Sequence, residues 1–341
     1  MKAALYNPYL DTLGGGERYV AGVIQAFEKA GYRVDLEWES AEMIKKLQER
    51  FGVKFQQTKV VGSINRGDGY DACFWVSDGS VPTLRSRNNI LHFQVPFVGV
   101  SGRTLINKMK FIRIKHVVVN SNFTKGFIDR EYGVYSKVIY PPVSVIDFRP
   151  RRKQNIICYV GRFSKLTQSK RQDVLVEVFK KFSKEVKGWK LVLAGGVEVG
   201  NDDFTEELRN KAKGYPVEIL ESPKLSEIKE LLGTSKMFWS AAGYGIDEQM
   251  IPSKVEHFGI SVVEAMAAKV APLVHNKGGY KEIIDDGKTG YLWTKKGELL
   301  KNAEFLANNF DNLRLISKNA SEASLRFSKA TFEQSFIELL K

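Results

Sequence analysis

Residues 256–268 read EHFGISVVEAMAA and place two carboxylates, Glu256 and Glu264, across a predicted junction between a loop and a helix. Apolar residues recur there at helical spacing, so we expect a helix that carries Glu264 on its first turn. The backbone N–H groups at a helix start attract phosphate. Glu256 can then reach the group attached to that phosphate, while Glu264 can accept hydrogen bonds from a hydroxyl pair such as a ribose. The stretch indicates a nucleotide-sugar site.

The same stretch has a second, structural interpretation. Ser261 and Glu264 have the spacing of a capping box, in which the glutamate closes the start of the helix without touching a ligand. The two interpretations are compatible. Only Glu256, together with cations elsewhere in the chain, can indicate whether Glu264 also contacts a ligand.

The length and composition predict a two-domain protein. A chain of 341 residues exceeds what one hydrophobic core usually serves, and a hydrophobic content of 43% suffices for two cores. No apolar run reaches membrane-spanning length, and no signal-peptide pattern opens the chain. Cys73 and Cys158 lie in apolar, strand-like runs, as expected for reduced core thiols. We therefore expect a soluble, cytoplasmic protein.

The net charge of +13 predicts an anionic partner. Nucleic acid is the weakest candidate, because the sequence has no zinc spacing, no RNA-binding aromatic signature and no basic recognition helix. Residues 103–115, RTLINKMKFIRIK, interleave five cations with six apolar residues. Such a segment can lie on an anionic membrane surface, which would make the protein peripheral to the membrane. The alternative is an ordinary amphipathic helix with a solvated cationic face.

Strand-like runs alternate with helical stretches along the whole chain, which predicts an α/β protein with parallel sheets. Paired prolines at 141–142 stop regular structure and mark a seam between two such sets. Strands are expected at 2–6, 33–36, 72–76, 89–93 and 116–120 before the seam, and at 156–160, 190–194, 217–220, 237–240 and 270–274 after it. An amphipathic helix is expected at 329–340.

A glycine loop, LGGGERY at 13–19, follows the first predicted strand and opens a helix. Glycines there let the backbone approach a ligand closely. The loop is not the dinucleotide fingerprint, because its third glycine would fall at Tyr19, and it lacks the ending of a P-loop. A plain tight turn is the alternative.

Two cations of the second half are expected to converge at the carboxyl edge of a sheet. Arg162 ends a strand and Lys170 opens the following helix, so together they can neutralise a diphosphate leaving group without a metal. Lys165 or Arg171 can equally supply the second cation. No Asp-x-Asp pair occurs in the chain, so a divalent metal clamp has no obvious place.

His92 ends a predicted strand of the first half, directly before a chain exit at Pro96. A lone histidine beside apolar residues is often a satisfied core group. Its position at a strand end also fits a catalytic role, and both interpretations stay open.

Taken in order, these features resemble the retaining glycosyltransferases of family four, which have the GT-B fold. The resemblance runs along nearly the whole chain, through GGGER (14–18), His92, VNSNFT (119–124), YPPV (140–143), GRF (161–163) with Lys170, residues 256–264 and GGYKEII (278–284). It implies two Rossmann-like domains facing a cleft, at 1–146 and 147–324. It also implies that a helix in 325–341 crosses back to the first domain.

The resemblance assigns roles to particular residues of the site. It implies that Arg162 and Lys170 hold the diphosphate, Glu264 the ribose and Glu256 the sugar hydroxyls. The amides of Phe258, Gly259 and Ile260 would bind phosphate or sugar oxygens. Gly15 and Gly16 would approach the donor phosphate from the first domain, and His92 would lie beside the sugar carbon under attack.

The EHFGI variant at 256–260 is also found in mannosyltransferases that extend dolichol-linked oligosaccharides. The resemblance therefore implies GDP-mannose as donor, a glycan or polyprenyl-linked acceptor, and no metal or other cofactor. Lys269, the segment 275–277 and the long loop 243–254 depart from the family pattern. Two rival functions remain: a GT-B epimerase or phosphorylase, and a non-catalytic, membrane-associated binding protein.

Overall fold

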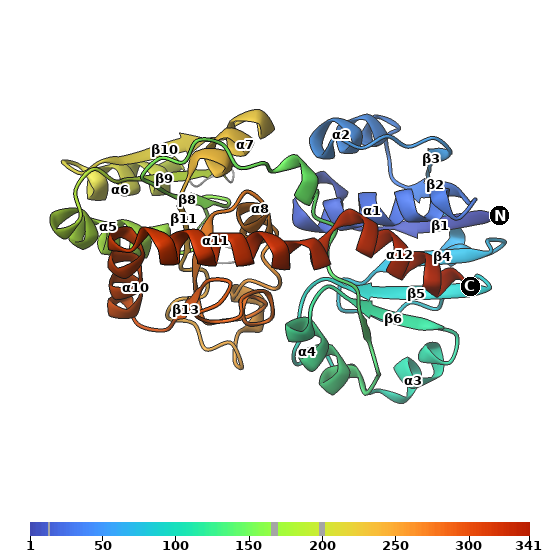
Figure 1. Ribbon diagram of the computed structural model, residues 1–341. Helices are drawn as coiled ribbons and strands as arrows, with labels where there is room; N and C mark the ends of the chain where they lie inside the picture. Colours follow the sequence, from blue (N-terminus) through green and yellow to red (C-terminus); the bar gives the residue numbers. More distant parts are fainter. Residues whose placement is uncertain (13, 165–169, 198–201) are drawn as a thin grey trace. The chain divides into compact units, whose positions relative to one another are not determined.

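The computed structural model describes residues 1–12, 14–164, 170–197 and 202–341. The chain divides into two compact units (Figure 1). Unit 1 comprises Met1–Pro142 together with Phe327–Lys341, and unit 2 comprises Val143–Arg326. Each unit is built on its own parallel sheet, as the alternation of strand-like and helical stretches predicted.

The sheet of unit 1 has seven strands in the order β3-β2-β1-β4-β5-β6-β7. Every neighbouring pair is parallel. The strand order reverses at β1, the kind of position beside which α/β proteins bind ligands. The strands are β1 (Lys2–Tyr6), β2 (Arg33–Glu37), β3 (Thr58–Val61), β4 (Ala72–Val76), β5 (Asn88–Phe93), β6 (His116–Val119) and β7 (Lys137–Val138).

Unit 1 has five α-helices among its described residues: α1 (Gly15–Lys29), α2 (Glu42–Phe51), α3 (Leu105–Phe111), α4 (Asn122–Tyr132) and α12 (Lys329–Leu340). Helix α12 joins this unit from the far end of the sequence, as the resemblance implied. Its Phe332 and Phe336 enter the core that α1 forms with β1 and β4. The Tyr19 ring of α1 contacts both phenylalanines edge-on, at centroid distances of 5.0 and 5.9 Å. This buried aromatic packing holds the chain terminus on unit 1.

The sheet of unit 2 has six parallel strands in the order β10-β9-β8-β11-β12-β13. They are β8 (Ile156–Val160), β9 (Lys190–Gly195), β10 (Val217–Glu221), β11 (Met237–Ser240), β12 (Ala271–His275) and β13 (Tyr291–Trp293). The helices are α5 (Gln172–Glu185), α6 (Asp202–Ala212), α7 (Leu225–Thr234), α8 (Ile260–Ala267), α9 (Tyr280–Ile283), α10 (Lys296–Asn308) and α11 (Phe310–Ser324). The order reverses at β8, so ligands are expected near its carboxyl end.

Three strands escaped the sequence analysis: β3, β7 and β13. Each has four residues or fewer, and each lies at the edge of its sheet. Edge strands need no continuous apolar run, because only part of their surface is buried. Among the described residues, none of the helices is long and apolar enough to cross a membrane.

The two cysteines are free and buried, as predicted. Burial raises the pKa of both Cys73 and Cys158 to about 12, so both stay protonated thiols at neutral pH.

Candidate active site

Helix α8 begins one residue after Gly259, which has a left-handed backbone with φ of +117°. A Cβ atom there would lie 2.6 Å from Cε1 of Tyr280, so only glycine fits this position. The early start corrects two predictions. Glu264 is the fifth residue of the helix and not part of its first turn, and Ser261 is the second residue and not the N-cap that a capping box requires. Glu264 is nevertheless buried, with 5% of its surface exposed.

Lys170 and Glu256 form an ion pair, with 2.7 Å between Nζ and Oε2. Their side chains are only 11% and 17% exposed, although 86 residues separate them in sequence. Burial acts to raise the pKa of Glu256, but the adjacent ammonium outweighs it and holds that pKa below its ordinary value. The structure thus brings together two residues that were predicted to bind neighbouring parts of one ligand.

The loop that carries Glu256 is fixed by the turn at Gly278 and Gly279. The Gly279 amide donates to the Glu256 carbonyl at 2.8 Å, and a Cβ on Gly278 would lie 2.1 Å from the same oxygen. Glu248 holds this turn from the long loop 243–254, because its carboxylate accepts from the Gly278 amide and from Lys281, at 2.8 and 2.7 Å. The loop that departs from the family pattern therefore supports the backbone of Glu256.

Arg162 follows the carboxyl end of β8 and has an exposed side chain. Its carbonyl accepts a hydrogen bond of 2.9 Å from Nε2 of Gln172, the first residue of α5, which ties the strand end to the helix that follows Lys170. Arg162 and Lys170 thus lie at the two ends of the connection between β8 and α5. Their convergence on one ligand stays a prediction. Lys165, an alternative second cation, is outside the described residues.

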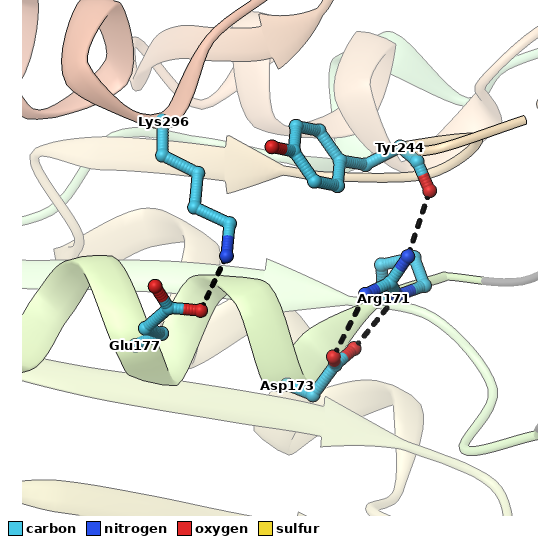
Figure 2. A network of polar contacts seen from close by, with 5 residues as sticks. All are labelled: Arg171, Asp173, Glu177, Tyr244 and Lys296. Atoms are coloured by element: carbon cyan, nitrogen blue, oxygen red, sulfur yellow. Dashed lines mark hydrogen bonds and ion pairs between the residues drawn. The ribbon is translucent and has the colours of Figure 1, made fainter.

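Arg171, the other alternative, is committed to protein groups (Figure 2). Its guanidinium donates twice to the Asp173 carboxylate, at 3.0 Å each, and once to the Tyr244 carbonyl, at 2.8 Å. The Tyr244 ring also contacts Lys296, which forms an ion pair with Glu177. These bonds argue against Arg171 as a ligand for diphosphate. Arg171 directly follows Lys170 and has a left-handed backbone, with φ of +51°. Its bonds to Asp173 and Tyr244 hold the chain next to the buried ion pair.

His92 is the last residue but one of β5 in unit 1 and is fully buried. Its Nδ1 lies 3.1 Å from the Val118 carbonyl, and since a carbonyl only accepts, Nδ1 carries the proton and Nε2 has a lone pair. Nε2 is buried and has no hydrogen-bond partner within the described part of the chain. Burial lowers the pKa of His92 to about 3, so the ring is neutral at pH 7. Its catalytic role stays a prediction.

The glycine loop opens α1, whose first residues are Gly15 and Gly16. The Glu17 carboxylate accepts from the Gly14 amide at 2.6 Å and thereby caps the helix start. A Cβ on Gly16 would lie 2.1 Å from Oε1 of Gln94. Leu13, which belongs to the same motif, is outside the described residues. The predicted approach of Gly15 and Gly16 to a phosphate stays a prediction.

Across residues 1–12, 14–164, 170–197 and 202–341, no group of three or more His, Cys, Asp and Glu side chains is placed to hold a metal ion. The groups of this region that can bind an anion are the cations near β8 and α5 and the amides at the start of α8. Such a combination fits a bound diphosphate.

The fold and these candidate groups fit an enzyme that transfers a sugar from a nucleotide donor. Residues 146–322 match the model of the family glycosyl transferases group 1, which is more than half of the chain, and the chain belongs to that family. Its fold is confirmed as GT-B: the structure of Anabaena HepE in complex with UDP and glucose superimposes with a TM-score of 0.76 over 99% of this chain and 98% of that one, at 17% identity.

Two curated relatives carry the name GDP-Man:Man(3)GlcNAc(2)-PP-Dol alpha-1,2-mannosyltransferase. The protein from Dictyostelium discoideum is 28% identical over 67% of this chain, and the protein from Mus musculus is 30% identical over 65%. In both cases the match covers 47% of the relative, so the chain spans about half the length of the curated relatives it matches.

Proposed function

We propose that this chain is a retaining hexosyltransferase that takes mannose from GDP-mannose and transfers it to a glycan or polyprenyl-linked acceptor. The names of the curated relatives support the donor and the lipid-linked acceptor. The observation that carries the proposal is the buried pair of Lys170 and Glu256, which joins a cation and a carboxylate near the start of α8.

The chemistry of the pair fits transfer from a nucleotide sugar. When the bond to the diphosphate breaks, negative charge grows on the leaving oxygen, and the ammonium of Lys170 with the guanidinium of Arg162 stabilises it. Glu256 accepts hydrogen bonds from the sugar hydroxyls. The incoming diphosphate competes with Glu256 for Lys170, so the ion pair holds the ammonium in place until the donor arrives.

The start of α8 binds the rest of the donor in this proposal. The amides of Phe258, Gly259 and Ile260 bind phosphate or sugar oxygens, because the positive end of the helix dipole favours an anion. The Phe258 amide bonds to the Glu256 carboxylate in the structure, so it binds the donor only after it releases that carboxylate. Glu264 accepts from the ribose hydroxyls. Because the two cations neutralise the diphosphate, we propose that transfer needs no metal and no other cofactor.

A polyprenyl-linked acceptor is held in a membrane. We therefore propose that the protein works in the cytoplasm as a peripheral protein at the membrane surface.

Donor identity can be tested by thermal unfolding with a panel of nucleotide sugars. GDP-mannose at 100 times its dissociation constant should stabilise the protein by about 2.7 kcal/mol, which raises Tm by several degrees. UDP-glucose is the matched comparison, because the HepE structure contains UDP and glucose. Stabilisation by UDP-glucose alone would contradict the mannose assignment, and stabilisation by no nucleotide sugar would contradict the proposed function.

The reaction is then followed with GDP-mannose and a short polyprenyl-linked acceptor, with NMR of the anomeric proton in the product. Retention predicts the α-anomer, as in the donor. Glu256→Ala should mainly lower kcat, since Glu256 contacts the group at which charge develops. A β-linked product, or a Glu256→Ala variant with full turnover at saturating substrates, would refute the assigned reaction centre.

A further inference from the structure

Helix α3 of unit 1 turns its apolar side chains toward solvent. Leu105, Ile106, Met109 and Ile112 are 74%, 65%, 62% and 84% exposed, and none of the residues of α3 is buried. An amphipathic helix of a globular protein normally buries this set of residues. Four large aliphatic side chains exposed within eight positions therefore indicate a surface that binds a partner molecule.

The inner side of this segment is held by cations. Nζ of Lys110 donates to the Val81 carbonyl at 2.8 Å, and Nε of Arg113 donates to the Leu84 carbonyl at 2.9 Å. Phe111 packs against a core cluster of unit 1. The aliphatic residues face outward, so the alternative of an ordinary amphipathic helix is wrong about its apolar face, which is not buried. Its cations are mostly exposed, as that alternative expected.

The preceding loop continues the exposed apolar surface. Val98 and Val100 are exposed, and the loop is fastened to α4 by Glu131, whose carboxylate accepts from the amides of Gly99, Val100 and Gly102. Figure 1 shows α3 and α4 as neighbours along the sheet of unit 1. We call this set the aliphatic patch: Val98, Val100, Leu105, Ile106, Met109 and Ile112.

The patch lies in a segment without acidic residues. Between residues 79 and 128 the sequence contains no Asp or Glu, whereas it contains Arg85, Arg87, Arg103, Lys108, Lys110, Arg113, Lys115 and Lys125. Of the cations closest to the patch in sequence, Arg103, Lys108, Arg113 and Lys115 are exposed. The exposed cations of this segment therefore flank the aliphatic patch, and the Glu131 carboxylate beside the loop is bonded to the amides of Gly99, Val100 and Gly102.

We propose that the aliphatic patch docks on an anionic lipid surface, with its aliphatic side chains among the acyl chains and the surrounding cations on the headgroups. This inference rests on the proposed function for its choice of a membrane as the partner. The observations that support it come from unit 1 alone. A second copy of the chain fits less well, since a two-fold interface would bring the same cations face to face. Single-stranded nucleic acid is bound by stacking on aromatic rings, which the patch lacks.

Co-sedimentation of the full chain with vesicles tests the proposal. Wild-type protein should bind vesicles of phosphatidylcholine mixed with phosphatidylglycerol far better than phosphatidylcholine alone, and binding should weaken as salt is raised. Ile106→Ser with Ile112→Ser should weaken binding by at least about tenfold, since two inserted aliphatic side chains are lost. Lys108→Glu should weaken binding to anionic vesicles only. Phe310→Ser with Leu315→Ser, which removes exposed apolar residues of α11 in unit 2, is the matched control and should bind like wild type.

Equal binding of the Ile106→Ser, Ile112→Ser variant and wild type, or binding that ignores lipid charge and salt, would overturn the proposal. A dimer in solution that the same double substitution abolishes would assign the patch to a second copy. Stabilisation by GDP-mannose should be unchanged in this variant. Vesicle binding without any donor response would refute the proposed function and leave the docking surface standing, and a donor response without vesicle binding would do the reverse.

Discussion

Replacing Lys170 by methionine should destabilise unit 2 strongly, because it leaves the Glu256 carboxylate without its cation. The Lys170 ammonium lies 2.7 Å from the Glu256 carboxylate, and both side chains are largely buried. Water therefore cannot fully replace the lost ammonium. Removing one partner of a buried ion pair costs about 3–5 kcal/mol. For a domain of this size each kcal/mol lowers Tm by about 2–4 °C, so Lys170→Met should lower Tm by about 6–20 °C.

The loss should depend on pH in a defined direction. In the wild type the pKa of Glu256 is lowered, so the pair stabilises the fold above the ordinary carboxyl pKa and this contribution is lost as pH falls through the lowered value. In Lys170→Met the lowering by the ammonium is lost, and burial, the largest influence on this carboxyl, then acts against only the weaker effects of His257 and the Phe258 amide. The pKa of Glu256 should therefore be higher than in the wild type, which favours its neutral form. The Tm difference between the two proteins should therefore shrink from about pH 8 to about pH 5, where the variant carboxyl takes up a proton.

Thermal unfolding by circular dichroism at several pH values measures this, with two further variants. Lys170→Met combined with Glu256→Gln should be more stable at neutral pH than Lys170→Met alone, since no buried charge remains. Lys190→Met breaks a pair of 3.0 Å with Glu218, but these side chains are 44% and 47% exposed, so the loss should stay below about 1 kcal/mol. If Lys170→Met loses no more stability than Lys190→Met, or if its loss does not change with pH, the buried pair is not the strong contact inferred here.

Three further outcomes are expected. Glu264→Ala should raise KM for the donor by the equivalent of about 1.5–3 kcal/mol with little change in kcat, and unchanged donor affinity with a lowered Tm would mean that Glu264 is only structural. Arg171→Gly should be more stable in urea than Arg171→Ala by about 1 kcal/mol, because both lose the bonds to Asp173 and Tyr244 but only glycine accepts the left-handed backbone without strain. The reverse order would exclude that strain. Transfer activity should survive EDTA, and a strict need for Mg²⁺ or Mn²⁺ would contradict the proposed neutralisation of diphosphate by Arg162 and Lys170.

Much of the site could be predicted because its parts are local in sequence. Gly259 marks the start of α8 because the left-handed backbone and the nearby Tyr280 ring leave no room for a side chain. Glu256 and Glu264 lie within nine residues of one another, so the same local motif at 256–264 predicts both positions. Arg162 and Lys170 follow from the rule that a strand end and the next helix start meet at one edge of a parallel sheet. The exact start of the helix was missed, because the sequence offered Ser261 as a cap and the backbone turned earlier.

The sequence by itself determined the two parallel α/β sets, the buried thiols and the motifs of the family, since alternating apolar periods and glycine positions act over a few residues. Only the tertiary structure decided three other features. Lys170 forms an ion pair with Glu256 across 86 residues, and His92 is buried against Tyr19. Helix α3 is held with its aliphatic residues outward because Lys110 and Arg113 donate to carbonyls of the connection between β4 and β5. Contacts of this kind depend on which segments the folded chain brings together, and no local pattern specifies them.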